Sequence, residues 1–254
     1  MHQPTERVIK IFELAASSAE GKRLSDFATE LEIPKSTLLP ILTTLCERHY
    51  LARESDRYFP GAALFSLARS FGEDHPTMDY VHRELISLVE KFGETCYFGV
   101  PDGGNVLYLD KVDSPNPLRM LTTIGRRLPA YATGVGKALL MGKSETELRG
   151  LYPDGLSPLT PKTITDISAL AAQLNQAVAE GYAREIEEST EFIRCFAVPV
   201  KKLGRTVAAI SIAIPVFRYD ESSRNEIIES LLAAATRLGG LLEATDGGFD
   251  NIFS

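Results

Sequence analysis

The sequence predicts an α+β chain with two parts, an N-terminal winged helix-turn-helix domain and a larger C-terminal domain built on a mostly antiparallel sheet. Two observations predict this fold class. Residues 24–51 have the pattern of two short helices that are joined by a tight turn and followed by a strand. From residue 95 onward, strand-like segments joined by short polar or glycine-containing turns are interleaved with helical segments.

Length and composition limit the class of protein. The chain has 254 residues, which suits two ordinary domains, and 44% hydrophobic with 24% charged residues is typical of a globular protein. No apolar run approaches the ~20 residues that span a bilayer, and the N-terminus has no signal-peptide core. We therefore expect a cytoplasmic protein without membrane contact. The three cysteines are far apart in the chain, so neither a disulfide framework nor a metal site is supported, and we expect no cofactor.

The first three helices are predicted from apolar periodicity and from residues that begin or end helices. We expect one helix from Thr5 to Ala16 and a second one capped by Ser25. The second helix is broken at Glu32, Ile33 and Pro34, because the residue before a proline is pushed out of the α region, and Pro34 suits the first position of the next helix. The third helix should bury one face at intervals of three and four residues, formed by Leu38, Ile41, Leu42 and Leu45.

The outward face of the third helix carries short polar side chains that can contact phosphates or base edges in a major groove. A strand, a polar turn and a returning strand follow at residues 49–59 and predict a wing. The residues that we expect to face DNA are Lys35, Ser36, Thr37, Leu39, Pro40, Thr43, Thr44, Arg48, Arg53 and Arg57. A purely structural helix pair remains open, because such pairs also occur away from DNA.

Bulk charge does not support nucleic-acid binding. Residues 1–62 contain eight Lys and Arg residues against nine Asp and Glu residues, and the whole chain has a net charge of −7. The DNA-binding hypothesis therefore rests on the fold pattern and on a local group of basic residues, Lys35, Arg48, Arg53 and Arg57.

A linker helix is expected between the two domains. An apolar stripe follows Gly61 and consists of Leu64, Leu67, Ala68 and Phe71. We place a DNA-binding domain at 1–62, the linker helix at 63–76 and the second domain at 77–254. The stripe can pack on its own domain or on the same helix of a second subunit.

The second domain is predicted to alternate helices and strands. We expect helices at 77–92, 165–181 and 220–242, and strands at 95–100, 106–112, 118–124, 182–186, 194–200 and 206–214. Between them, Thr133 caps a short helix that begins with Gly134, Val135 and Gly136. The unpaired N–H groups of this helix start can hold a carboxylate, or the glycines can serve close packing.

Several stretches resemble known sequences. RVIKIFELAAS, the stretch from Leu24 that contains PKST, and RYFPGAALFSLA resemble the N-terminal domain of the IclR family of transcriptional regulators. LPAYATGVGKALL, GYAREIEE and RCFAVPVKKLGRTVAAISIAIP resemble segments of the GAF-like effector-binding domain of that family. The resemblance covers residues 5–245. It implies a regulator that binds a palindromic double-stranded DNA operator as a homodimer, through the linker helix, or as a dimer of dimers (homotetramer), with affinity modulated by a small organic acid.

The resemblance also implies an effector pocket, and the chain departs from the family pattern at four positions. The implied pocket residues are Leu118, Leu121, Gly134, Val135, Gly136, Glu185, Cys195, Ser211 and Ala213. Glu185 and Ala213 stand where aspartate and serine are expected, so we expect a ligand that is larger or more apolar than a two- or three-carbon acid. Pro40 stands where an arginine is expected, with Leu39 in place of a polar residue, so a base contact is lost and the sequence preference should differ.

Catalysis is not expected. A Cys195 nucleophile would need a histidine, but His2, His49, His75 and His82 all lie in the first third of the chain. No GxSxG, HExxH or phosphate-loop motif occurs, and Glu187-Glu188 is interpreted as a polar loop. Two alternatives remain, a metabolite sensor that has lost DNA recognition and a redox sensor in which Arg194 lowers the pKa of Cys195. Arg119, Arg126, Arg127 and Arg194 can each pair with an effector carboxylate or lie solvated on the surface.

Overall fold

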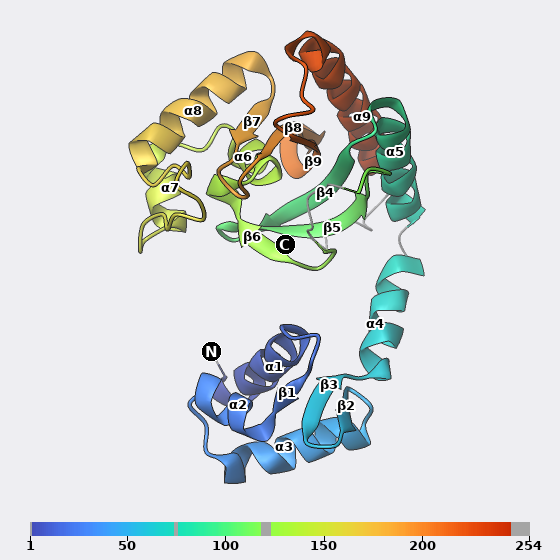
Figure 1. Cartoon of the computed structure of the whole chain (residues 1–254), viewed down its shortest axis with the longest axis vertical. Coiled ribbons are helices and arrows are strands. Elements are labelled where there is room, and N and C mark those ends of the chain that lie inside the picture. The colour runs from blue at the N-terminus through green and yellow to red at the C-terminus, as the bar shows by residue number, and fades with distance from the viewer. Residues whose placement is uncertain (1, 74–75, 118–122, 245–254) are drawn as a thin grey trace. The chain divides into compact units, whose positions relative to one another are not determined.

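The computed structural model describes residues 2–73, 76–117 and 123–244 (Figure 1). Its contacts divide the chain into two compact units, Met1–Asp74 and His75–Ser254. No helix within the described ranges combines the length and the hydropathy that a membrane span requires.

The first unit contains three helices and a small sheet around one core. The helices are α1 (Gln3–Ala16), α2 (Leu24–Glu30) and α3 (Lys35–Glu47), and the antiparallel strands β1 (Lys22–Arg23), β2 (Leu51–Glu54) and β3 (Arg57–Pro60) pair in the order β1-β3-β2. The core contains Ile11, Ala15, Phe27, Leu38, Leu42, Leu51 and Tyr58. Helix α4 (Ala62–Glu73) follows the wing. This is the predicted winged helix-turn-helix arrangement.

The start of α2 corrects one prediction. Ser25 is not the N-cap, because the helix begins at Leu24 and Arg23 occupies the cap position. The backbone N–H of Arg23 donates to the Asp26 carboxylate at 2.7 Å. The side-chain hydrogen bond at this helix start therefore comes from Asp26, the third residue of the helix, and not from Ser25. Strand β1 lies between α1 and α2, where no strand was expected, and it exists because Lys22 pairs with Tyr58 of β3.

The second unit is a six-stranded antiparallel sheet with helices on both faces (Figure 1). The strand order is β6-β5-β4-β9-β8-β7, where the strands are β4 (Thr95–Asp102), β5 (Asn105–Val112), β6 (Arg127–Pro129), β7 (Ala183–Ile186), β8 (Ile193–Lys202) and β9 (Arg205–Pro215). Helices α5 (Pro76–Phe92) and α9 (Arg224–Ala244) cover one face. Helix α6 (Gly134–Leu140) packs on the other, with α7 (Glu145–Leu151) and α8 (Ile167–Glu180) beyond it.

Alternation along the strands separates the two faces of this sheet. Phe98, Phe196 and Ile210 point to α5 and α9, where the largest core cluster lies. Their neighbours Tyr97, Cys195 and Ala209 point to α6. The face under α6 carries mostly small or polar side chains, so a short helix can approach the sheet closely there.

Three expected boundaries differ from the structure. Residues 118–122 of the expected strand 118–124 lie outside the described residues, and Ile124 lies in a turn; the strand that pairs with β5 here is β6. Helix α8 is capped by Asp166, whose carboxylate accepts the N–H of Ala169 at 2.8 Å, rather than opened by Thr165. Helix α9 begins at Arg224, after a 3-10 turn over Glu221–Ser223.

Candidate DNA-binding and effector-binding sites

Helix α3 presents the expected surface to solvent. Leu38 and Leu42 are fully buried on its inner side. The expected DNA-facing residues of this helix are all exposed, namely Lys35, Ser36, Thr37, Leu39, Pro40, Thr43, Thr44 and the C-cap Arg48. Pro34 is the N-cap, so Pro40 lies in the second turn of the helix, where it cannot donate the hydrogen bond that the carbonyl of Ser36 would otherwise receive.

The threonine hydroxyls of α3 are bonded to the helix itself. Thr43 Oγ1 donates to the carbonyl of Leu39 at 2.8 Å, and Thr44 Oγ1 donates to the carbonyl of Pro40 at 2.9 Å. Their hydrogens are therefore already used, and the two side chains offer solvent a methyl group and an acceptor oxygen.

The two wing arginines are held differently. Arg57 is half-buried and its guanidinium donates to the carbonyls of Glu20 and Gly21, at 3.2 and 3.0 Å, so it ties the wing to the loop before β1. Arg53 is exposed, lies 5.5 Å from the Tyr58 ring centre and donates through Nε to the carbonyl of Ser55. Lys35, Arg48 and Arg53 are thus the exposed cations of the predicted set.

The expected effector residues meet on the α6 face of the sheet. Strand pairing places Glu185 of β7 beside Cys195 of β8, and Cys195 beside Ala213 of β9. Ser211 lies two residues before Ala213 on the same face, paired with Ala197. All four expected residues are buried. Leu118 and Leu121 lie outside the described residues.

Glu185 is the most unusual group in this region, because its carboxyl group is completely buried. Oε1 accepts the backbone N–H groups of Glu188 and Ser189, the latter at 2.9 Å, whereas Oε2 has no hydrogen-bond partner among the described residues. Burial raises the pKa of Glu185 to about 7, against the opposing effect of the two N–H donors. The carboxyl group therefore exists in both protonation states near neutral pH.

Cys195 lies in contact with this carboxyl group. Burial, together with the neighbouring Glu185, raises the pKa of the thiol well above its usual value. A thiol in these surroundings is a weak donor and a poor nucleophile. Arg194 does not offset this, because its guanidinium lies 3.8 Å from the ring centre of Tyr219, in the aromatic group with Phe196 on the opposite face of the sheet.

A buried ion pair next to Glu185 was not expected from the sequence. Lys137 of α6 and Glu188 are both almost fully buried, and the amine donates to the carboxylate. Burial lowers the pKa of Lys137, and Glu188 opposes that shift. Glu187 and Glu188 lie in a bend after β7, as the sequence predicted, but Glu188 is buried there, whereas Glu187 pairs with the exposed Lys162. Lys137 and Glu188 are 51 residues apart, so no local pattern could have joined them.

The glycines at the start of α6 serve close packing. A Cβ on Gly134 would lie 2.6 Å from that of Cys195, and one on Gly136 would lie 2.2 Å from the Cα of Ala130. Thr133 caps the helix as predicted, since its hydroxyl accepts the N–H of Gly136 at 3.0 Å and its carbonyl accepts that of Lys137 at 2.8 Å. Fewer N–H groups are thus left for a ligand than the sequence suggested.

Two tyrosines on the α6 face of the sheet were not predicted as site residues from the sequence. The rings of Tyr97 and Tyr108 meet edge to face with centres 5.3 Å apart, and both side chains are buried. Tyr97 pairs with Ser211 across β4 and β9, so strand alternation was the signal that could have found it. Burial raises the pKa of the Tyr108 phenol, which stays protonated and lies near Thr133, Cys195 and Glu185.

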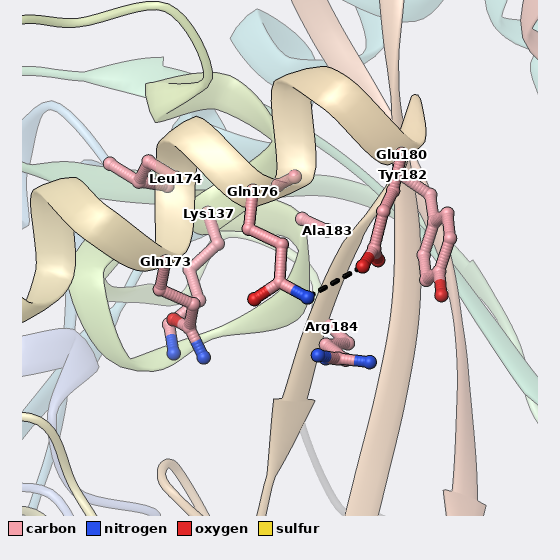
Figure 2. Close-up of a pocket in the computed structure, with 9 residues that line it drawn as sticks. Lys137, Gln173, Leu174, Gln176, Glu180, Tyr182, Ala183 and Arg184 are labelled. Atoms are coloured by element: carbon pink, nitrogen blue, oxygen red, sulfur yellow. Dashed lines mark hydrogen bonds between the residues drawn. The ribbon is translucent and has the colours of Figure 1, made fainter.

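A separate small pocket lies behind this site, between α8 and β7 (Figure 2). Its lining includes Lys137, Gln173 and Arg184, and at its rim Gln176 donates to Glu180 at 2.6 Å. It has room for about one water molecule, so it is too small for a metabolite. No group of three or more His, Cys, Asp or Glu side chains suited to a metal ion occurs among the residues that the structure covers.

Known proteins resemble this chain over most of its length. The family model for the C-terminal domain of the bacterial transcriptional regulator IclR matches residues 74–239. The HTH-type transcriptional regulator KdgR of Escherichia coli K12 is 31% identical over 252 residues, which cover 95% of this chain and 94% of that protein.

Solved structures share the architecture. A putative transcriptional regulator from Rhodococcus sp. RHA1 superposes with a TM-score of 0.79 at 26% identity, over 99% of this chain and all of that one. An IclR homologue from Microbacterium hydrocarbonoxydans, complexed with 4-hydroxybenzoate, has a TM-score of 0.81 at 22% identity, over 94% and 98% of the two chains, and shows the shared fold. The named relatives are transcriptional regulators and not enzymes, and the predicted fold class is confirmed. The chain belongs to the IclR family of helix-turn-helix transcriptional regulators.

Proposed function

We propose that this protein is a regulator whose affinity for operator DNA is set by a small carboxylate-bearing metabolite bound on the α6 face of the sheet, beside Glu185. The observation that carries the proposal is the Glu185 carboxyl group, which is completely buried and has one oxygen without a hydrogen-bond partner among the described residues. A buried polar atom of this kind costs stability unless a ligand or water completes it.

The chemistry of the site suits an organic acid with an apolar part. In its neutral form Glu185 can donate one hydrogen bond to a carboxylate or carbonyl oxygen, and Ser211 and Cys195 offer further, weaker donors. Tyr97, Tyr108 and Ala213 add aromatic and apolar surface, which favours a ligand larger than a two- or three-carbon acid. The homologue complexed with 4-hydroxybenzoate carries an acid of this general kind.

On the DNA side, we propose that α3 enters the major groove and that Lys35, Arg48 and Arg53 contact phosphates. A homodimer formed through α4 would present two such helices to a palindromic operator, with half-sites about one helical turn apart or a multiple of it. The exposed apolar side chains of α4 support this, because Phe65 is 74% exposed and Leu67 is 57% exposed in the isolated chain. Pairing of dimers into a tetramer is part of the same proposal.

Two other functions receive less support. Redox sensing by Cys195 requires a thiolate, and the raised pKa of this buried thiol disfavours one. A metabolite sensor without DNA recognition is favoured by one observation, the placement of Pro40 on the outward face of α3.

The test is fluorescence anisotropy of a labelled duplex from immediately upstream of the protein's own gene, at two salt concentrations. We expect salt-sensitive binding that exceeds binding to a scrambled duplex by about a thousandfold, and a change in affinity on addition of one member of a panel of hydroxy, keto and aromatic acids. No preference over the scrambled duplex, with or without the acids, would favour the metabolite sensor.

Matched variants separate the two sites. Glu185→Gln should abolish the response to the acid while DNA binding persists, and Glu187→Gln, in the neighbouring surface pair, should change neither. Thr43→Glu should abolish DNA binding by placing a carboxylate in the major groove, where the potential of the DNA is negative. Thr236→Glu is its control, because Thr236 is also exposed and also donates to the carbonyl four residues earlier. A Thr43→Glu protein with unchanged affinity would refute the docking face.

A further inference from the structure

The middle of the outward face of α3 is apolar. Leu39 is 45% exposed, and Pro40 beside it is exposed and has no donor in its backbone or side chain. Leucine is usually buried in a small three-helix core, and Leu38 next to it is completely buried. The surface that faces solvent here is thus hydrocarbon at the centre of the helix.

The polar residues around this apolar surface do not supply strong donors at its centre. The hydroxyl hydrogens of Thr43 and Thr44 are used by the carbonyls of Leu39 and Pro40, so these side chains add methyl groups to the same surface. Glu47, one turn beyond Thr43, is an acceptor and not a donor. Guanine is read in the major groove through its N7 and O6 acceptors, and the central residues of α3 have no free donor for them.

The cationic residues lie at the ends of the helix and on the wing. Lys35 is the first residue of α3, Arg48 is its C-cap, and Arg53 extends from β2. This distribution suits phosphate contacts on either side of a groove, with the apolar residues over the base edges between them. The apolar group that the major groove offers is the C5-methyl group of thymine.

We infer that Leu39 and Pro40, with the methyl groups of Thr43 and Thr44, read thymine C5-methyl groups at the centre of each operator half-site. This inference rests on the proposed docking of α3 in the major groove and adds the chemical class of base that it reads. A half-site selected by this surface contains A·T pairs with thymine methyls facing α3, where an arginine in place of Pro40 would select guanine.

The experiment removes the methyl groups from the DNA and leaves its hydrogen bonds intact. Duplexes that bind the full-length protein are enriched from a randomised library, and each thymine of the best duplex is replaced in turn by deoxyuridine. Loss of one methyl group under α3 should weaken binding about fourfold, and loss of the symmetry-related pair about fifteenfold. Deoxyuridine placed outside the base pairs that the protein contacts serves as the control and should leave the affinity unchanged.

Two variants assign the effect to the side chains. The Leu39→Ala protein should lose its discrimination between thymine and deoxyuridine at the affected positions, with its remaining affinity carried by the phosphate contacts. The Pro40→Arg protein should enrich a guanine at the neighbouring position in the same selection, because arginine can donate to N7 and O6 together.

The outcomes separate this inference from the proposed function. Enrichment of a duplex that tolerates deoxyuridine at every position would overturn the thymine reading and leave the regulator in place. Failure to enrich any duplex, with and without the panel of acids, would overturn both. A Leu39→Ala protein that still discriminates thymine from deoxyuridine would overturn the assignment to Leu39.

Discussion

At the scale of single residues, Glu185 works against folding at neutral pH. Its carboxyl group is buried in the native protein and solvated in the unfolded chain, where its pKa is near the usual value of 4.5. Because the pKa in the folded protein is about 7, the native state binds more protons than the unfolded chain between these two values. Stability from this group is fully present below pH 4.5 and is lost as the pH rises to about 7.

Glu185→Gln should therefore gain stability relative to the wild type as the pH rises. The difference in the free energy of unfolding, variant minus wild type, should increase by about 2 to 4 kcal/mol between pH 4.5 and 7.5. Urea unfolding of both proteins across this range measures it. Glu147→Gln is a control with the opposite pH dependence. Hydrogen bonds from Ser144 lower the pKa of Glu147, so the stability that this carboxylate contributes is lost as the pH falls. Parallel curves for the wild type and Glu185→Gln would contradict the raised pKa.

Lys137 and Glu188 give the second prediction at this scale. Lys137→Met should destabilise the protein by about 3 kcal/mol, because it leaves the Glu188 carboxylate buried without its partner. The double variant Lys137→Met, Glu188→Gln should recover much of that loss, since no buried charge then remains at either position. Arg149→Met breaks an exposed pair with Glu145 and should cost less than about 1 kcal/mol. Thermal unfolding of the wild type and the three variants measures these differences in stability. A double variant as unstable as Lys137→Met would show that lost packing, not the unpaired charge, causes the destabilisation.

At the scale of elements, α4 exposes two large apolar side chains, Phe65 and Leu67. Leu67→Glu should convert a dimer to monomers, raising the dimer dissociation constant about a hundredfold or more, because a symmetric contact would bury two carboxylates. Sedimentation velocity across protein concentrations measures the change. Val178→Glu on α8 removes an apolar side chain of similar exposure, 50% against 57%, and should leave the dimer intact. A Leu67→Glu protein that remains dimeric would place the contact elsewhere.

The elements also show what sequence could and could not predict. Helices α3, α5 and α9 were predicted because their apolar residues recur every three or four positions, which is local information. Strands β1 and β6 have two and three residues and owe their existence to partners in β3 and β5, so no local pattern identifies them. In the same way, Glu185 was selected by resemblance, but its burial and the ion pair of Lys137 with the adjacent Glu188 depend on contacts between distant segments.

At the scale of the whole molecule, regulation requires that effector binding to one compact unit and DNA binding to the other depend on the same conformational equilibrium. Met1–Asp74 carries the helix-turn-helix and His75–Ser254 carries the proposed effector site, so an effector changes DNA affinity only if it binds two states of the protein unequally. Linkage then demands reciprocity, because the operator must change effector affinity by the same factor as the effector changes operator affinity.

We predict that this factor lies between about 5 and 150, a coupling of about 1 to 3 kcal/mol. Isothermal titration of the acid into the free protein and into the protein saturated with operator measures one side of the cycle, and anisotropy of the operator with and without the acid measures the other. Glu185→Gln should lose both effects while it keeps its operator affinity, and Glu187→Gln should keep both. An acid that alters operator binding but binds the free and the DNA-bound protein equally would show that it acts outside this cycle, for example by changing the association of subunits.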